Sequence, residues 1–244
     1  MKNVRLLIEY DGTEFYGWQK QKSERTVCET IESVIREVTG EETKLIGCSR
    51  TDSGVHARGF VAAFKTESSI PSERFQYAIN ARLPEDVVIL SSEEVPLEFH
   101  PRFQAKGKTY CYTIFNRKSP IAIGRNYSCL VKEKLNTEKM KEACRYFEGT
   151  HDFKAFMSSG SSVKTTVRTI WNISVERVSD EIKIYVTGDG FLYNMVRIIA
   201  GTLLMVGEEK ISPEFIIEII KSGDRNKAGK CMPSSGLYLE KVFY

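Results

Sequence analysis

The sequence predicts the α+β fold class, in the form of two tandem βαββαβ units. The order strand, helix, strand, strand, helix, strand occurs twice along the 244 residues, as changes in hydrophobic period indicate. That length allows two domains of about 100 to 140 residues, each with its own core. A composition with 41% hydrophobic and 27% charged residues excludes a disordered chain, a collagen-like repeat and a disulfide scaffold.

The first half, residues 1–104, opens with a strand over Asn3–Tyr10, which is rich in Val, Leu and Ile. A loop punctuated by glycines follows as far as Ser23. The next segment is a helix, because Thr26-Val-Cys-Glu29 fits a capping box and Gly40 provides a stop. The apolar residues at helical spacing between these signals are Val27, Ile31, Val34, Ile35 and Val38.

Three more strands and one helix complete this half. Short strands are predicted over residues 44–49 and 60–65, joined by the polar stretch Arg50–Gly59. A second helix is expected from Pro71 to Leu83, and a strand over residues 87–90 ends the unit.

The second half, residues 105–244, repeats this order with longer elements and one inserted helix that Ser212-Pro213 opens. The predicted elements are strand 109–115, helix 137–147, strand 166–178, strand 181–187, helix 192–206 and strand 237–243. Two split βαβ units of the ferredoxin-like kind explain this order most simply. Periodicity leaves open whether they form one long mixed sheet or stay apart around a cleft.

Charge divides the two halves, although the whole chain carries only +3. Residues 1–104 sum to −4 and residues 105–244 to +7. No acidic residue occurs between Glu98 and Glu133, or between Asp152 and Glu176. Clustered cations attract polyanions, so nucleic acid is the leading class of partner. The alternative is that these Lys and Arg side chains merely face solvent from strands.

The six cysteines and three histidines do not have the spacing of a zinc site, and we expect no metal. No apolar stretch reaches 18 residues, and the N-terminus does not resemble a signal peptide. We therefore expect a cytoplasmic protein without a membrane segment, with reduced thiols.

The stretch from Gly47 to Arg58 contains the strongest candidates for chemistry, namely Arg50, Asp52, His56 and Arg58. An Arg two residues before Asp52 favours the charged carboxylate, which a nucleophile requires. The alternative is a simple turn, because Asp-Ser-Gly has ordinary turn chemistry.

Arg50-Thr-Asp-Ser-Gly-Val-His-Ala57 resembles the catalytic-loop motif of the bacterial tRNA pseudouridine synthase A (TruA) family. Four further segments occur in the same order as in that family, so the resemblance covers nearly the whole chain. They are Tyr10-Asp-Gly-Thr-Glu-Phe-Tyr-Gly-Trp-Gln19, Phe99-His-Pro-Arg-Phe103 with Lys108-Thr-Tyr-Cys-Tyr112, Phe191-Leu-Tyr-Asn-Met-Val-Arg197, and Gly236-Leu-Tyr-Leu239.

The resemblance implies a pseudouridine synthase fold with a central active-site cleft. The implied enzyme is a cofactor-free homodimer that isomerises uridines 38 to 40 in the tRNA anticodon stem-loop. Asp52 matches the catalytic aspartate, Tyr110 the tyrosine that stacks on the target base, and Arg197 the basic partner of the aspartate. Leu237 matches a residue that lines the pocket. Whether Asp52 attacks C1′ or C6, or removes a ribose proton, stays open.

The remaining candidates are assigned to substrate binding. Because a target base must leave its stack, an aromatic platform and nearby cations are needed, and Arg50 is assigned to intercalation or to a phosphate. His56 and Arg58 complete the set, although His56 could instead bind loop carbonyls. Without the resemblance, Tyr110 would be interpreted as sheet packing and Arg197 as a solvent-facing residue.

Two rival functions remain. Cys48, Ser49 and Ser53 depart from the family pattern, which is compatible with a paralogue that modifies other uridines or another RNA. A catalytically idle RNA-binding protein of the same fold is the rival from another class. The presence of Asp52, Tyr110 and Arg197 argues against it, since phosphate binding alone needs neither the carboxylate nor the aromatic platform.

Overall fold

The computed structural model describes residues 1–160 and 163–244, which form two compact units. Unit 1 contains Met1–Lys106 and Tyr238–Tyr244, and unit 2 contains Gly107–Leu237. The predicted division fell after residue 104 and kept the whole last strand in the second half. The C-terminal residues instead group with unit 1, because the last strand pairs with a strand of that unit.

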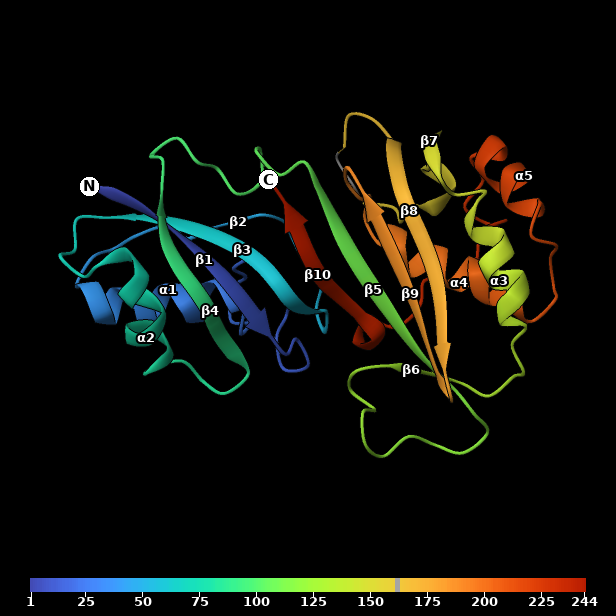
Figure 1. The fold of residues 1–244 in the computed structure, drawn as a ribbon, viewed down its shortest axis with the longest axis horizontal. Helices are drawn as coiled ribbons and strands as arrows, with labels where there is room; N and C mark the ends of the chain where they lie inside the picture. Colours follow the sequence, from blue (N-terminus) through green and yellow to red (C-terminus); the bar gives the residue numbers. More distant parts are fainter. Residues whose placement is uncertain (161–162) are drawn as a thin grey trace. The chain divides into compact units, whose positions relative to one another are not determined.

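Unit 1 is a sheet with two helices against it (Figure 1). Its strands are β1 (Lys2–Tyr10), β2 (Ile46–Gly47), β3 (His56–Thr66), β4 (Val87–Val95) and β10 (Leu237–Phe243). They lie in the order β4-β1-β3-β10, with β2 also beside β3. The first four strands pair antiparallel, as in a split βαβ unit, whereas β10 pairs parallel to β3.

The helices of unit 1 are α1 (Val27–Thr39), the 3₁₀ turn η1 (Ser72–Arg74) and α2 (Phe75–Asn80). Gly40 ends α1 as predicted, with a left-handed φ of 74°. The predicted capping box is wrong, because the Thr26 side chain makes no cap hydrogen bond. The N–H groups of Val27 and Cys28 donate instead to the carbonyls of Gly17 and Trp18.

Two other predicted boundaries in unit 1 are also wrong. The polar stretch ends at residue 55 instead of 59, since pairing of Tyr238 with His56 extends β3 backwards. The second helix is shorter than predicted. Asn80 ends it by exchanging two side-chain hydrogen bonds of 2.8 Å with the backbone of Ile89.

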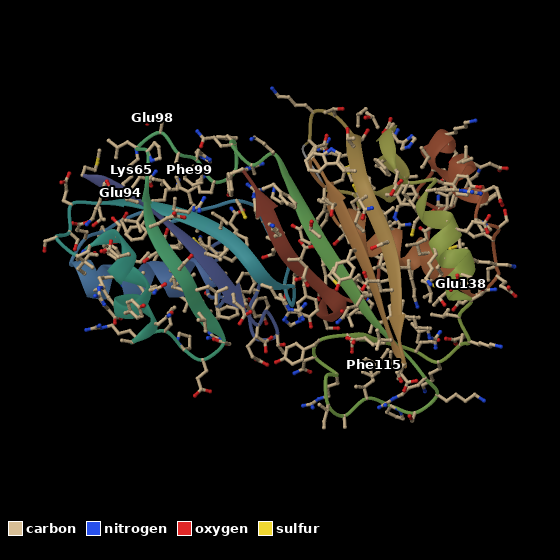
Figure 2. All side chains as sticks on the ribbon, viewed as in Figure 1. Lys65, Glu94, Glu98, Phe99, Phe115 and Glu138 are labelled. Atoms are coloured by element: carbon tan, nitrogen blue, oxygen red, sulfur yellow. The ribbon has the colours of Figure 1, made fainter. Side chains whose placement is uncertain are left out.

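The strands of unit 2 also pair mainly antiparallel. Its strands are β5 (Gly107–Asn116), β6 (Cys129–Val131), β7 (Gly149–Asp152), β8 (Val167–Val178) and β9 (Glu181–Gly188). They lie in the order β5-β9-β8-β7, and β6 pairs parallel to β5 near Phe115, at the end of that strand labelled in Figure 2. The sequence missed β6 and β7 because each has only three or four residues.

The helices of unit 2 are α3 (Thr137–Cys144), η2 (Lys154–Phe156), α4 (Met195–Gly207), α5 (Phe215–Ser222) and η3 (Ser234–Gly236). Helix α4 begins three residues later than predicted, because Asn194 has a left-handed φ of 62°. The predicted α+β class and mixed, mainly antiparallel pairing are confirmed. Within the described ranges, no helix has the length and apolar character needed to cross a membrane.

Candidate active site

The loop that carries Asp52 joins β2 to β3 and consists of residues 48–55, here called the Asp52 loop. A second loop, residues 11–18, follows β1 and is bonded to it. The Trp18 N–H donates to the Thr51 carbonyl over 3.2 Å, and the Gly54 N–H donates to the Phe15 carbonyl over 3.2 Å. The conformation of the Asp52 loop is therefore fixed by main-chain bonds to the 11–18 loop.

Two glycines allow these loops to approach so closely. A Cβ atom on Gly12 would lie 2.0 Å from the Val55 carbonyl oxygen, and one on Gly17 would lie 2.3 Å from the Thr51 carbonyl oxygen. Gly17 also has a φ of +85°, which L side chains rarely adopt. The sequence placed both residues in a loop but gave no sign that they support residue 52.

Asp52 itself is half-buried, while its neighbour Thr51 is buried and Arg50 is exposed. The Thr51 hydroxyl is 2.8 Å from the Tyr10 hydroxyl, which links the loop to the end of β1. The Val55 N–H donates to the Asp52 carbonyl over 3.2 Å. The carboxylate thus sits on a rigid turn, and the exposed Arg50 guanidinium is available to an approaching anion.

His56 is buried, with 2% of its surface exposed. The Gly12 N–H donates to Nδ1 over 3.0 Å, and the ring stacks on Tyr238 with centroids 4.9 Å apart. Asp11 Oδ1 lies 3.1 Å from the same nitrogen. The Gly12 N–H and the Asp11 carboxylate thus meet the same ring nitrogen, and the contact with Asp11 is an ion pair only when the imidazole is protonated. His56 holds the two loops together, and its role in substrate binding stays a prediction.

Arg58 follows on the same face of β3 and is also tied to β10. Its Nη1 lies 2.6 Å from Glu240 Oε1, and its guanidinium carbon lies 4.3 Å from the Tyr238 ring centroid. Tyr238 thus touches both His56 and Arg58. The sequence included Tyr238 in a segment that resembles the family but gave no role to it or to Glu240, because nothing local predicts that β10 lies against β3. Substrate binding by Arg58 stays a prediction.

Tyr110 and Tyr112 lie on β5 in unit 2, and both are buried. The Tyr110 ring meets Phe191 edge-on, with centroids 5.2 Å apart. The Tyr112 hydroxyl donates to the Pro233 carbonyl over 2.8 Å, and burial raises the pKa of this phenol far above its usual range. Tyr112 is therefore a neutral structural residue at all ordinary pH values.

Arg197 lies in the first turn of α4 and is half-buried. Its Nε donates to the Met232 carbonyl over 2.6 Å and its Nη1 to Asn194 Oδ1 over 2.7 Å. The Asn194 amide in turn donates to the Ser158 hydroxyl. This network orients the guanidinium. The sequence placed Asn194 in a segment that resembles the family but assigned it no role, since its left-handed conformation follows from the fold around it.

Leu237 is buried and ends unit 2. The preceding Gly236 is in close contact with the Tyr112 ring, because a Cβ there would lie 2.7 Å from Cζ. The structure thus groups Arg50, Asp52, His56 and Arg58 in unit 1, and Tyr110, Arg197 and Leu237 in unit 2. Among the residues described, no three His, Cys, Asp or Glu side chains form a group that could hold a metal ion.

Comparison with known proteins gives a family and full-length relatives. Residues 6–104 and 143–244 match the family described as tRNA pseudouridine synthase. The chain is 58% identical over 244 residues to tRNA pseudouridine synthase A 2 of Clostridium perfringens, with 100% of each chain covered. It is 56% identical to tRNA pseudouridine synthase A of Clostridium acetobutylicum and 55% identical to that of Acetivibrio thermocellus, again over 100% of each chain.

Among solved structures, a Cbf5-Nop10-Gar1 complex matches 96% of this chain and 57% of its own, at 12% identity. Its TM-score of 0.38 is too low to support a conclusion about this chain.

Proposed function

Since the chain belongs to the tRNA pseudouridine synthase family, whose members are isomerases that act on uridine in tRNA, we propose that Asp52 is its essential carboxylate. We further propose that the substrate uridine is at one or more of positions 38, 39 and 40 of the anticodon stem-loop. The observation that supports Asp52 most strongly is the pair of nested loops, which hold a half-buried carboxylate on main-chain bonds.

The reaction needs no redox partner, because it only exchanges one bond for another. The bond from ribose C1′ to uracil N1 breaks, the uracil turns, and C1′ bonds to C5. The proton on C5 leaves, and N1, which carried no proton while it was bonded to C1′, takes one up, so atoms and charge balance. An ionised Asp52 can begin this sequence by attack on C1′, by attack on C6, or by removal of a ribose proton.

The other predicted residues take supporting roles in this proposal. Tyr110 stacks on the extruded base, for which its buried strand position against Phe191 is suited. Arg197, oriented by Asn194 and the Met232 carbonyl, keeps the carboxylate ionised. Leu237 supplies an apolar wall, and exposed Arg50 binds a phosphate beside the target nucleotide.

The proposal also includes a homodimer that acts in the cytoplasm and holds one tRNA across both subunits. Support comes from the basic residues 105–244, whose charge of +7 suits a polyanion, and from the family's tRNA substrate. Sedimentation of the protein alone and with tRNA would test the dimer, and a monomeric complex would contradict it.

Release of tritium from C5 of labelled tRNA tests the activity and Asp52 together. We expect release by the wild type and a loss of at least a thousandfold in Asp52→Asn, which keeps the shape but removes the charge. Asp180→Asn, a partly exposed carboxylate 3.8 Å from Arg117 Nη1, is the matched control and should keep full activity. If the wild type releases no tritium, the proposed isomerase activity is wrong. If Asp52→Asn releases as much tritium as the wild type, only the assignment of Asp52 as the essential carboxylate is wrong.

Mapping the product positions by chemical marking of pseudouridine would test the choice of uridine. Pseudouridine at positions 38 to 40 is the expected result. Exclusive formation at another position, or in another RNA, would favour the paralogue.

A further inference from the structure

The segment that follows β4, residues 96–106, is firmly bound to unit 1 even though it has no regular structure. The Asn3 side chain donates to the carbonyls of Pro96 and Phe99, at 3.1 Å each. The Tyr244 hydroxyl donates to the Pro101 carbonyl over 2.8 Å. The Phe99 ring packs against Tyr244, and Figure 2 shows Phe99 beside Glu98 at this end of the unit. A segment bound at so many points is a rigid support.

One aromatic side chain projects from this support. Phe103 is 76% exposed, which is unusual for a large apolar residue on an anchored loop. One side of its ring is stacked on His100, with centroids 4.2 Å apart and planes inclined by 30°. The N–H groups of Arg102 and Phe103 both donate to His100 Nδ1, so the imidazole is fixed in place. A second flat ring can stack on the other side of Phe103 at little entropic cost.

Two cations lie close to Phe103 in the sequence of this segment, namely Arg102 and Lys106. Arg102 and Lys106 are exposed, and in the described ranges no carboxylate lies within ion-pair distance of either. The Arg102 guanidinium carbon is 6.0 Å from the Phe103 centroid, at the outer limit of a cation–π contact. Its charge is therefore available to an anion. An exposed ring on a segment that carries such cations is a combination that binds a base together with its phosphates.

The position of this ring relative to the Asp52 loop defines which nucleotide it can meet. β10 pairs at Tyr238 with His56, next to the Asp52 loop, and at its other end the Phe243 carbonyl accepts the Lys106 N–H. The five residue steps between Tyr238 and Phe243 span about 17 Å at 3.3 Å per residue. At about 3.4 Å per nucleotide, that is roughly five nucleotides along a strand. The ring therefore meets a base other than the one that Asp52 modifies.

We propose that Phe103, backed by His100, is a stacking platform for an unpaired base of the tRNA substrate, about five or more nucleotides from the modified uridine. Arg102 and Lys106 bind the phosphates that flank this base. The inference rests on the proposed function, because it takes tRNA as the substrate. It adds a second point of attachment that orients the tRNA, and it assigns a use to the cations that begin the acid-free run after Glu98.

Binding of tRNA to Phe103→Ala tests the platform. We expect the Kd and the KM for tRNA to rise about five- to hundredfold, the range that one stacked base supplies. Phe103→Trp should restore binding, since it keeps the flat ring. Tyr77→Ala is the matched control: Tyr77 is 60% exposed and has Arg74 at 5.7 Å, but it lies on α2, away from the 96–106 segment in the sequence. This control should bind tRNA like the wild type.

Three outcomes would overturn the platform. An unchanged Kd for Phe103→Ala excludes stacking, and an equal loss in Tyr77→Ala shows a nonspecific effect. A change of sedimentation in Phe103→Ala, without tRNA present, shows instead that the ring contacts another protein chain. Release of tritium by the wild type is measured separately. An unchanged Kd in Phe103→Ala contradicts the stacking platform, whereas an absence of tritium release by the wild type contradicts the proposed isomerase activity.

Discussion

The two units hold their functional side chains in different ways. In unit 1 the Asp52 loop is fixed by main-chain hydrogen bonds, and Gly12 and Gly17 make room for them. In unit 2 the side chains themselves make the contacts, since Arg197 binds Asn194 and the Met232 carbonyl. The backbone therefore positions the carboxylate, whereas a side-chain network positions the cation. Activity should therefore fall when a side-chain atom is added to a glycine of unit 1, and when a hydrogen-bonding group is removed from the side-chain network of unit 2.

Gly17→Ala should have the largest effect, because its Cβ would displace the Thr51 carbonyl next to Asp52. A displacement of about 1 Å lowers activity roughly a hundredfold. Gly40→Ala is the control, since Gly40 has a similar φ of +74° and no atom within 4 Å of the added Cβ. Both variants should lose about 1 kcal/mol of unfolding free energy from the positive φ, but only Gly17→Ala should lose activity. Equal activity in both variants would show that the close contact between the 11–18 loop and the Asp52 loop does not position Asp52.

Arg197→Lys tests the side-chain network of unit 2. Lysine keeps the charge but cannot donate to Asn194 Oδ1 and the Met232 carbonyl in the same fork geometry. Loss of one such bond corresponds to about 1.4 kcal/mol, so we expect about a tenfold fall in kcat/KM. Asn194→Ala should produce part of the same loss. Wild-type kcat/KM in Arg197→Lys would show that charge alone is sufficient.

His56 provides a smaller test in unit 1, because its two possible roles predict different measurements. His56→Phe keeps the stack on Tyr238 but leaves the buried Gly12 N–H without an acceptor, which costs about 1–3 kcal/mol of unfolding free energy. Urea unfolding should show this loss, and His56→Asn should restore part of it. If activity falls in His56→Phe while stability does not, His56 is a substrate contact instead of a structural one.

Local signals predicted much of the fold. The apolar period of α1 and its Gly40 stop gave nearly its observed length, and the last strand was predicted residue for residue. The errors arise where distant segments meet. The capping box was wrong because α1 begins against the carbonyls of Gly17 and Trp18, and β3 was predicted too short because β10 lies beside it. Neither contact leaves a local trace in the sequence.

The same limit applies to the site. The motif at Asp52 was visible because its residue types are unusual for a turn. The roles of the residues that position it were not visible. Gly12 lies close to the Val55 carbonyl and Tyr238 stacks on His56, and both contacts join segments that are distant in the sequence. Local sequence therefore shows which groups do chemistry more readily than which groups hold them in place.

The last comparison concerns the stability of the two units at alkaline pH, which has no direct effect on activity at neutral pH. Burial raises the pKa of Cys28, on α1 of unit 1, to about 12, and that of Cys144, on α3 of unit 2, to about 12. In the unfolded chain both thiols ionise near pH 8.5 to 9. Below that pH both states keep the proton and stability is unaffected. As pH rises toward 12, only the unfolded chain loses it, so the unfolding free energy falls by up to about 1.4 kcal/mol per pH unit for each thiol.

Cys28→Ala and Cys144→Ala measure these contributions separately. Each should reduce the fall in unfolding free energy between pH 9 and 11, measured in urea, without abolishing it, because burial also raises the pKa of Tyr112 and Tyr244. If the units unfold together, the two variants should flatten the same transition to a similar extent. If they unfold separately, each variant should change only the transition of its own unit. An unchanged slope in both variants would contradict the burial of these thiols in the folded state.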